Sequence, residues 1–299
     1  MTLKYLLGVS SFGLSIVVIF LNIIIFVPVF RLAFISKKST VYIIAFFNII
    51  SDLMQASVLG LYLSTSMMAD QYLLAGSRDS FVNLFLSGVF LNGWFMECLV
   101  QIVMAVNRFA VITLNKHYIF TFNTTLVIFF FLVTTTVFSV VCTQYLFPCC
   151  KFILDQDALT MLFINIEGLY SYSNLMLVSY DIVCTTTSTI CYVAVFFSIR
   201  NSQKSVASNI NRSSQDSKFL LQFVLISIFY VLAWVLFEIL PFIVPADQPQ
   251  WYSVIPFLVT LNCSSNAIIY LALNREIQKS MRTSWLASKI SAATVSSQI

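Results

Sequence analysis

A chain of 299 residues that is 59% hydrophobic and only 9% charged cannot cover itself with a water-soluble surface. Soluble domains carry roughly 25% charged residues, and the mean hydropathy of this chain is +0.91. These values exclude a soluble globular protein and indicate a polytopic membrane protein. The formal net charge of +4 reflects membrane orientation and gives no indication of nucleic-acid binding.

Seven apolar stretches are long enough to cross a bilayer. Crossing ~30 Å of hydrocarbon takes about 20 helical residues, and backbone groups in lipid must be satisfied within each segment. The runs are also too uniformly apolar for a membrane barrel. The spans are expected near 5–30, 41–66, 81–113, 121–147, 173–199, 219–245 and 251–273. The sequence therefore predicts an all-α seven-transmembrane bundle that forms a single domain over 1–299.

The first of these stretches has an alternative interpretation as a secretory signal, since Lys4 precedes an apolar run. However, residues 5–30 contain no charge at all, so the run exceeds the apolar region of a cleaved signal. We therefore expect an uncleaved first span.

Basic residues set the expected orientation, because they gather on the cytoplasmic side of a membrane. With an extracellular N-terminus, only Lys4, Arg78 and Lys151 of the 16 basic residues lie in outer segments. This distribution predicts a multi-pass plasma-membrane protein, embedded in lipid, with its C-terminus in the cytoplasm.

The segment 274–299 is a short cytoplasmic tail in this interpretation. Apolar residues recur there at helical spacing, namely Ile277, Met281, Trp285 and Leu286. This pattern predicts a short amphipathic eighth helix on the inner membrane surface. The alternative is a disordered tail.

Four carboxyl groups fall within the predicted spans, at Asp52, Glu97, Asp181 and Glu238. No Lys or Arg lies at comparable depth, so these groups must be protonated, hydrated, or paired with a cation or ligand. We favour a hydrated structural site for Asp52 and treat the other three as candidates for lining a ligand cavity. Trp234 is a further candidate, although core packing is the commoner role of such a residue. The alternative is protonated acids that hydrogen-bond between helices.

The seven cysteines suggest little disulfide framework, because five of them lie within spans. Only Cys149 and Cys150 are expected on the outer side, and no outer partner is available to them. Adjacent cysteines rarely pair, since disulfides usually join Cα atoms ~5.5 Å apart. We therefore expect no disulfide.

Several short motifs occur in a fixed order along the spans. Asn22 lies in the middle of the first, "NIISD" with Asp52 in the second, and "NRF" (107–109) at the end of the third. "FEILP" with Pro241 follows in the sixth, and "NAIIY", from Asn266 to Tyr270, in the seventh. In this order and orientation, the chain resembles the rhodopsin-like G-protein-coupled receptors. It looks most similar to the nematode serpentine chemoreceptors of class x (Srx), because of "NRF", short loops, Phe-rich helices and "CCKF" after the fourth span.

This resemblance implies a chemosensory receptor that binds an extracellular small molecule or peptide and activates a heterotrimeric G protein. By that resemblance Asn107, Arg108 and Phe109 contact the G protein. The residues that carry the activating rearrangement are then Asn22, Asp52, Pro241, Asn266 and Tyr270. A sensory cilium is the implied location, with no cofactor or metal. The alternative for Arg108 is an arginine that only anchors the helix end.

The chain also departs from the family pattern, and two of these departures concern residues discussed below. Asn107 stands where the acidic partner of the arginine usually lies. Asn83 and Ser87 occupy the outer end of the third span, where no cysteine occurs, so the usual disulfide to the second outer loop cannot form.

Two other functional classes were weighed against a receptor. A serine-type membrane enzyme needs a Ser–His pair, but the only histidine, His117, lies in an inner loop. An aspartyl-type enzyme usually shows a Gly-x-Gly-Asp motif, and the sequence contains no Gly-x-Gly. We therefore expect no enzyme. A channel or transporter of the odorant-receptor type remains the alternative, although the distribution of basic residues opposes its inside N-terminus.

Overall fold

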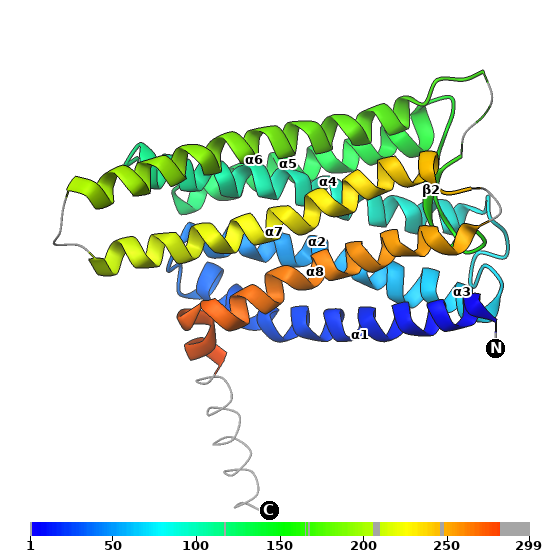
Figure 1. Ribbon diagram of the computed structural model, residues 1–299, viewed down its shortest axis with the longest axis horizontal. Helices are drawn as coiled ribbons and strands as arrows, with labels where there is room; N and C mark the ends of the chain where they lie inside the picture. Colours follow the sequence, from blue (N-terminus) through cyan, green and yellow to red (C-terminus); the bar gives the residue numbers. More distant parts are fainter. Residues whose placement is uncertain are drawn as a thin grey trace, which may run out of the picture.

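The computed structural model describes residues 2–281 except 117, 165, 167, 206–209 and 246–247, and no side chains within 202–223 or at 225–226. The long helices run side by side along one axis of the molecule (Figure 1). In this described part, six helices are long and apolar enough to span a membrane, and a shorter apolar helix covers Ser227–Ile243. The predicted seven-helix membrane bundle is therefore confirmed.

The first four spans each combine an α-helix with a π-helical turn. They are α1 (Leu3–Phe30) with η1 (Arg31–Ile35), α2 (Thr40–Val58) with η2 (Leu59–Ser64) and α3 (Thr65–Ala69), α4 (Phe81–Arg108) with η3 (Phe109–Thr113), and α5 (Phe122–Val141) with η4 (Cys142–Leu146). After them come β1 (Phe152–Asp155), β2 (Thr160–Phe163), α6 (Tyr172–Ser205), α7 (Ile210–Ile243), and the 3-10 turn η5 (Pro249–Ser253) leading into α8 (Val254–Leu273).

Local sequence explains where several helices begin. Hydroxyl side chains immediately before α1, α2, α4 and α5 accept a backbone N–H of the first turn, at Thr2, Ser39, Ser80 and Thr121. Such caps satisfy donors that the helix itself leaves unpaired. Beyond α8, residues 275–281 are also helical, while Trp285 and Leu286 of the predicted amphipathic helix lie outside the described residues.

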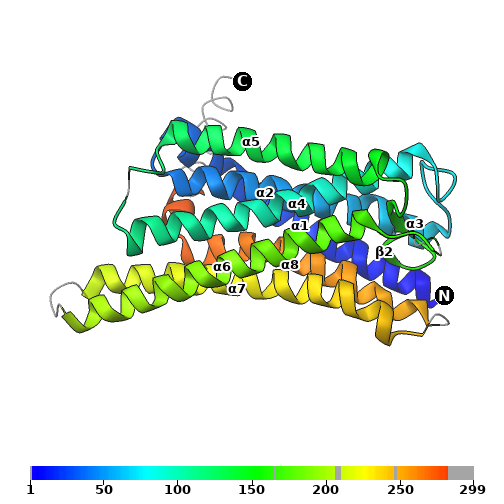
Figure 2. The same cartoon turned by 90° about the horizontal axis from the view of Figure 1, so that it is seen from above.

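Helix α4 is the central element of the bundle. It contacts α2, α5 and α6 as well as β1, and Figure 2 shows it running alongside α2. Gly93 permits the close approach to α2, because a Cβ atom there would lie 2.8 Å from Gln55 Cγ and 3.1 Å from the Ser51 carbonyl oxygen. Several of the polar side chains considered below, including Glu97 and Arg108, belong to α4.

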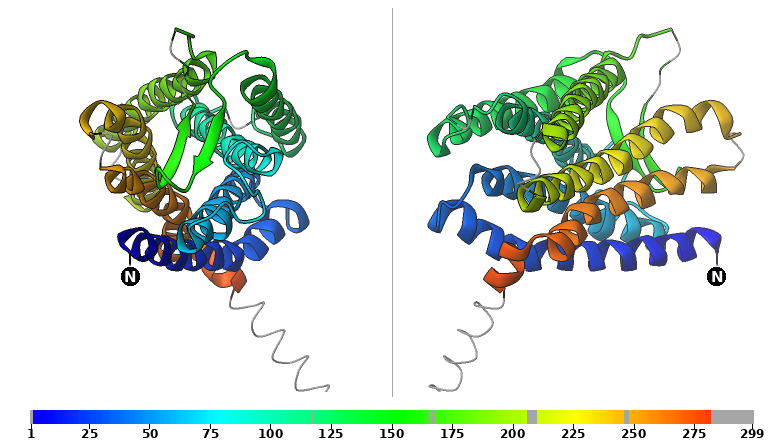
Figure 3. Two further views of the ribbon diagram at one scale, coloured as in Figure 1. Left: turned by 90° about the vertical axis from the view of Figure 1, so that its right-hand side faces the viewer. Right: turned by 60° about the vertical axis from the view of Figure 1, so that its left-hand side comes forward.

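A β-hairpin forms in the loop between α5 and α6, where no secondary structure was predicted. Its strands pair antiparallel, with Phe152 opposite Phe163 and Asp155 opposite Thr160. Asp155 Oδ1 accepts the backbone N–H of Asp157 (2.9 Å), a contact typical of a tight turn. Seen end-on, the hairpin lies across the middle of the ring of helices (Figure 3, left). We call this end of the bundle the hairpin end, and the opposite end, where α4 finishes at Arg108, the arginine end.

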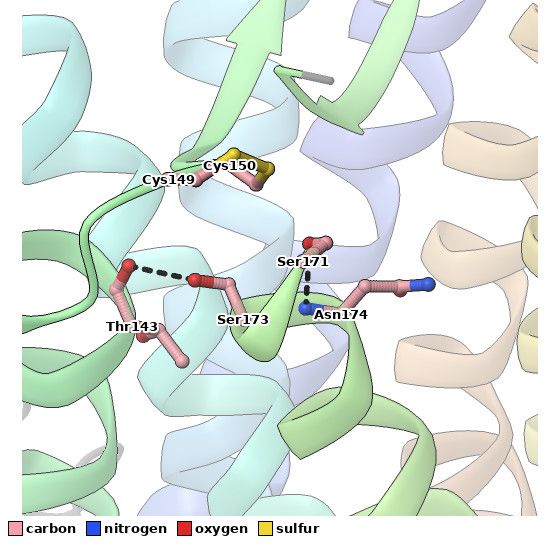
Figure 4. The surroundings of a disulfide bond; sticks show 6 residues. All are labelled: Thr143, Cys149, Cys150, Ser171, Ser173 and Asn174. Atoms are coloured by element: carbon pink, nitrogen blue, oxygen red, sulfur yellow. Dashed lines mark hydrogen bonds between the residues drawn. A yellow bond between two sulfur atoms is a disulfide. The ribbon is translucent and has the colours of Figure 1, made fainter. Parts of the chain in front are cut away.

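A disulfide joins Cys149 and Cys150, which corrects the expectation that these neighbours stay unpaired (Figure 4). Their Cα atoms are 3.7 Å apart, which is shorter than the usual disulfide spacing. Cys150 has a left-handed backbone (φ 70°), and both side chains are buried. Just beyond, Ser173 Oγ donates to the Thr143 carbonyl oxygen (3.0 Å) and joins the start of α6 to η4.

Candidate functional site

Side chains from two helices fix the hairpin by hydrogen bonds. Asn83 Nδ2 donates to the Leu154 carbonyl oxygen (3.1 Å), and the Leu154 N–H donates to Ser87 Oγ (2.9 Å). Gln144 Nε2 donates to the carbonyl oxygen of Phe152 (2.9 Å). Asn83 and Ser87 are one helical turn apart on α4, so they present adjacent groups to the same strand. Hydrogen bonds with Asn83 and Ser87 thus connect the hairpin to α4. These two residues lie at the outer end of the third span, where the family's disulfide cysteine is absent.

Ionic contacts tie the hairpin to neighbouring segments. Asp155, which is only 4% exposed, accepts from Arg78 (2.8 Å) and from the Tyr72 hydroxyl (2.8 Å). Burial raises the pKa of Tyr72, and its hydrogen bond to Asp155 raises it further. Lys4 at the start of α1 pairs with Asp70 (2.5 Å) and Asp157 (3.1 Å). The hairpin is therefore held by both the first span and the loop before α4.

Replacing Asp155 with alanine should loosen the hairpin, because Arg78 and Tyr72 lose their shared acceptor. Because Arg78 is 45% exposed and can be solvated, the loss should cost about 1 kcal/mol. Faster amide hydrogen exchange over residues 152–163 measures the effect. The matched control is Asp79→Ala, because Asp79 is an exposed acid in the loop before α4 that also carries Arg78 and Tyr72. Equal exchange in the two variants would contradict this anchoring role.

A cavity of about 580 Å³ lies between the hairpin, the start of α6, the end of α7 and the start of α8. Its polar lining includes Glu238, Asp157 and Asn174. Its apolar lining is rich in aromatic rings, from Phe163, Phe237, Phe242 and Tyr252. Pockets of this size, mainly apolar with a few convergent polar groups, are typical of small-molecule sites.

Asp181 lies deeper than this cavity and joins three helices. Its Oδ1 accepts from Trp94 Nε1 of α4 (3.0 Å) and from the Tyr230 hydroxyl of α7 (2.5 Å). The Cys98 thiol completes the cluster, 2.8 Å from the Tyr230 oxygen. Asp181 is only 1% exposed, and its Oδ2 has no hydrogen-bond partner among the described residues. The cluster couples the positions of α4, α6 and α7.

A second, small apolar cavity of about 10 Å³ shares lining residues with the large cavity and with the Asp181 cluster. Phe237, Met161 and Ile255 line both cavities, and Trp94 lines the small one. Phe237 also packs against the hairpin ring of Phe163, with centroids 6.2 Å apart. Trp94, which donates to Asp181, therefore lines the same small cavity as three residues of the large cavity's wall.

A polar network occupies the middle of the bundle, where every member is buried. Glu97 accepts from Gln55 Nε2 (2.9 Å), Asn262 Nδ2 (2.5 Å) and Gln101 Nε2 (3.3 Å). Asp52 accepts from Asn266 Nδ2 (2.9 Å) and interacts electrostatically with Glu97. Neither acid forms a salt bridge within the described part of the chain. The network joins α2, α4 and α8 through neutral amides.

Asn22 lies next to this network and connects α1 to α8. Its side-chain amide donates to the carbonyl oxygen of Cys263 (3.0 Å) and to that of Val18 in its own helix (3.1 Å). Because Asn22 is fully buried, these bonds fix how α1 sits against the helix that carries Asn262 and Asn266.

The arginine end contains Arg108 at the last position of α4. Arg108 is half-buried and interacts electrostatically with Tyr192 of α6 and Tyr270 of α8. Its neighbour Asn107 is buried, and Phe109 packs against the core at this end. Two of the predicted residues, Arg108 and Tyr270, therefore come together.

A separate ionic contact links the segment after α8 to the start of α2. Glu276 accepts from Lys38 Nζ (2.6 Å) and from the Tyr42 hydroxyl (2.6 Å). Burial acts to raise the pKa of Glu276, but the hydrogen bonds from Lys38 and Tyr42 outweigh it and lower the pKa below its ordinary 4.5. The contact is thus made by the ionised carboxylate.

Because the pKa of Glu276 is lower in the folded protein, its stabilising contribution is present above 4.5 and is lost as pH falls through the lowered value. The side chain is 44% exposed, so Glu276→Gln should cost at most about 1 kcal/mol at neutral pH. Thermal unfolding of the wild type and of Glu276→Gln across pH 3–7 measures this stability difference. The window is set by ordinary carboxyl pKa values of about 4. The difference in stability between the two proteins should shrink toward the acid end, and a pH-independent difference would count against the ionic contact.

The remaining predicted residues occupy separate positions. Glu238 and Pro241 line the large cavity. Trp234 is half-buried, and its indole nitrogen has no hydrogen-bond partner within the described residues. Sequence reasoning missed the partners of the acids, namely Gln55, Gln101, Asn262, Asn174, Tyr230 and Cys98. Pairs of polar residues four apart, such as Glu97 with Gln101, were the available signal.

The fold is similar to that of known receptors. The crystal structure of squid rhodopsin matches with a TM-score of 0.75 and 13% sequence identity, over 95% of this chain and 86% of that chain. At this identity the likeness concerns the fold alone. No curated protein gives a match.

A family model described as "Serpentine type 7TM GPCR chemoreceptor Srt" matches residues 1–294. The superfamily inferred from the ordered motifs is therefore confirmed, but the expected class x is wrong. The grounds for class x were "NRF", short loops, Phe-rich helices and "CCKF", and this chain, which matches the Srt family model, carries all four. This chain belongs to the Srt family of serpentine seven-transmembrane chemoreceptors.

Proposed function

We propose that this chemoreceptor binds an extracellular ligand in the hairpin-end cavity and activates a heterotrimeric G protein at the arginine end. One observation carries the proposal: the 580 Å³ cavity and Arg108 lie toward opposite ends of the bundle, with clusters of buried polar side chains between them. A ligand acts by preferring one of two bundle arrangements and so shifting their populations. The receptor resides in the plasma membrane of a sensory cell, in contact with lipid, with the cilium as the proposed location.

The rearrangement starts at Phe237 and Glu238 of α7, which face the cavity. Displacement of α7 then alters the bond of Tyr230 to Asp181 and the position of Trp94 on α4. Asp52, Glu97, Asn22 and Asn266 transmit the change along α4 and α8. Asn107, Arg108 and Phe109 form the proposed contact with the G protein, and Pro241 and Tyr270 permit the helix movement.

Terminal topology is the first test of this function. Epitope tags at both ends should give an N-terminal signal in intact cells and a C-terminal signal only after permeabilisation. A cytoplasmic marker stained in parallel controls for leaky cells. An N-terminus accessible only after permeabilisation would contradict a G-protein-coupled receptor and would direct attention to ion currents instead.

A further inference from the structure

The hairpin-end cavity has acids in its wall and no described cation. Two carboxyl groups, of Asp157 and Glu238, belong to its lining, which includes no Lys, Arg or His among the described residues. Asp157 already pairs with Lys4 (3.1 Å) and accepts from Gln156 (2.8 Å). Glu238 is therefore the acid whose countercharge is missing from the described protein.

Two oxygen atoms at this wall lack a partner. Glu238 Oε1 is buried and accepts no hydrogen bond from the described residues, and the same holds for Asn174 Oδ1. The two side chains interact with each other, which places them side by side across the gap between α6 and α7. Buried acceptors left without donors are costly, so a ligand that brings donors to this point gains affinity.

The carboxyl group of Asp181 also favours a positive charge near Glu238. It lies close enough to Glu238 for the two acids to interact electrostatically. It also keeps Oδ2 unpartnered while only 1% exposed. An anionic ligand would place a further negative charge beside these two carboxyl groups, whereas a cationic ligand stabilises their ionised form.

We propose that the cavity selects a ligand with a protonated amine attached to an apolar body. The ammonium group has three donors and no acceptor, which suits the free oxygens of Glu238 and Asn174. Phe163, Phe237 and Tyr252 line the cavity. Their rings offer apolar surface for the body of the ligand, and aromatic rings also attract a cation. This inference rests on the proposed ligand-binding role of the cavity but not on coupling to a G protein.

Binding to the purified full-length receptor in neutral-lipid nanodiscs tests the proposal. Three probes of similar size differ in charge: phenethylamine, phenethyl alcohol and hydrocinnamate. Stabilisation against thermal unfolding as a function of probe concentration reports affinity. We expect the amine to bind at least about tenfold more tightly than the alcohol, and hydrocinnamate to bind most weakly.

Substitutions test whether the preference for the amine over the alcohol arises at Glu238. Glu238→Gln should abolish the advantage of the amine over the alcohol, whereas Asp79→Asn, at an exposed acid outside the cavity lining, should retain it. Asn174→Asp adds a carboxylate beside Glu238 and should tighten amine binding, so the proposal stays testable if Glu238→Gln fails to fold.

Several results would overturn this ligand class. They are equal or tighter binding of the alcohol or the acid, no amine binding at millimolar concentration, and an amine preference that survives Glu238→Gln. Amine binding without stimulated nucleotide exchange would support the ligand class and count against G-protein coupling, so the two proposals fail separately.

Discussion

Replacing Arg108 with alanine should abolish ligand-stimulated nucleotide exchange on a heterotrimeric G protein and leave the receptor at the cell surface. Arg108 is the last residue of α4, half-buried, and interacts with Tyr192 of α6 and Tyr270 of α8. It therefore stands where three helices meet at the proposed coupling face. Loss of its charge would remove the proposed contact with the G protein, and each tenfold fall in rate corresponds to about 1.4 kcal/mol.

The matched control for this prediction is Arg200→Ala, because Arg200 is an exposed arginine in the part of α6 that follows Tyr192. Exchange should fall more than about tenfold in the Arg108 variant and stay close to wild type in the Arg200 variant. Surface labelling of both variants separates a coupling defect from a trafficking defect. Normal exchange in Arg108→Ala would leave this residue as a helix anchor only.

The second large effect is expected at Gly93, where leucine should prevent correct packing of α4 against α2. A Cβ atom at this position would lie 2.8 Å from Gln55 Cγ and 3.1 Å from the carbonyl oxygen of Ser51. The backbone oxygen cannot rotate away, so the helices must separate. Overpacking of this kind costs roughly 1–3 kcal/mol, and displacement of Gln55 also removes a donor from Glu97.

Gly13→Leu provides the comparison, since a Cβ atom at Gly13 would meet nothing within 4 Å. Thermal unfolding in detergent and the yield of receptor at the cell surface should both fall for Gly93→Leu and stay near wild type for Gly13→Leu. Indistinguishable unfolding temperatures for the two variants would show that the close approach of α2 and α4 is not required.

Apolar length predicted the bundle because hydrocarbon imposes both the length and the helical state of each span. Apolar length does not predict where a helix ends once the chain leaves the membrane. The apolar runs suggested 173–199 and 219–245, whereas α6 continues to Ser205 and α7 already begins at Ile210. Polar residues remain helical there without contributing to hydropathy.

The hairpin could not be predicted because its stability comes from contacts made elsewhere in the chain. Each strand has four residues, and isolated hairpins are marginal in water. Asn83, Ser87 and Gln144 satisfy its backbone from α4 and η4, and nothing in the sequence of 152–163 identifies them. The disulfide between Cys149 and Cys150 likewise depends on a left-handed backbone that composition does not reveal.

The acids of the candidate site were visible in the sequence, but their partners were not. Asp52, Glu97, Asp181 and Glu238 stand out because charge is rare within apolar spans. Which amide or hydroxyl each one meets depends on how helices distant in the sequence rotate and pack, as with Glu97 and Asn262. Polar residues at a spacing of four indicate the face involved but not the helix opposite.

The anchoring of the hairpin by separate hydrogen bonds also has an evolutionary consequence. A disulfide between α4 and the hairpin would be present or absent as a whole, and losing one cysteine would leave the other reactive. Asn83, Ser87 and Gln144 can instead be exchanged one at a time, each changing the attachment by about 1 kcal/mol. Since that corresponds to roughly a fivefold change in an equilibrium, single substitutions can change in small steps how firmly the hairpin is held.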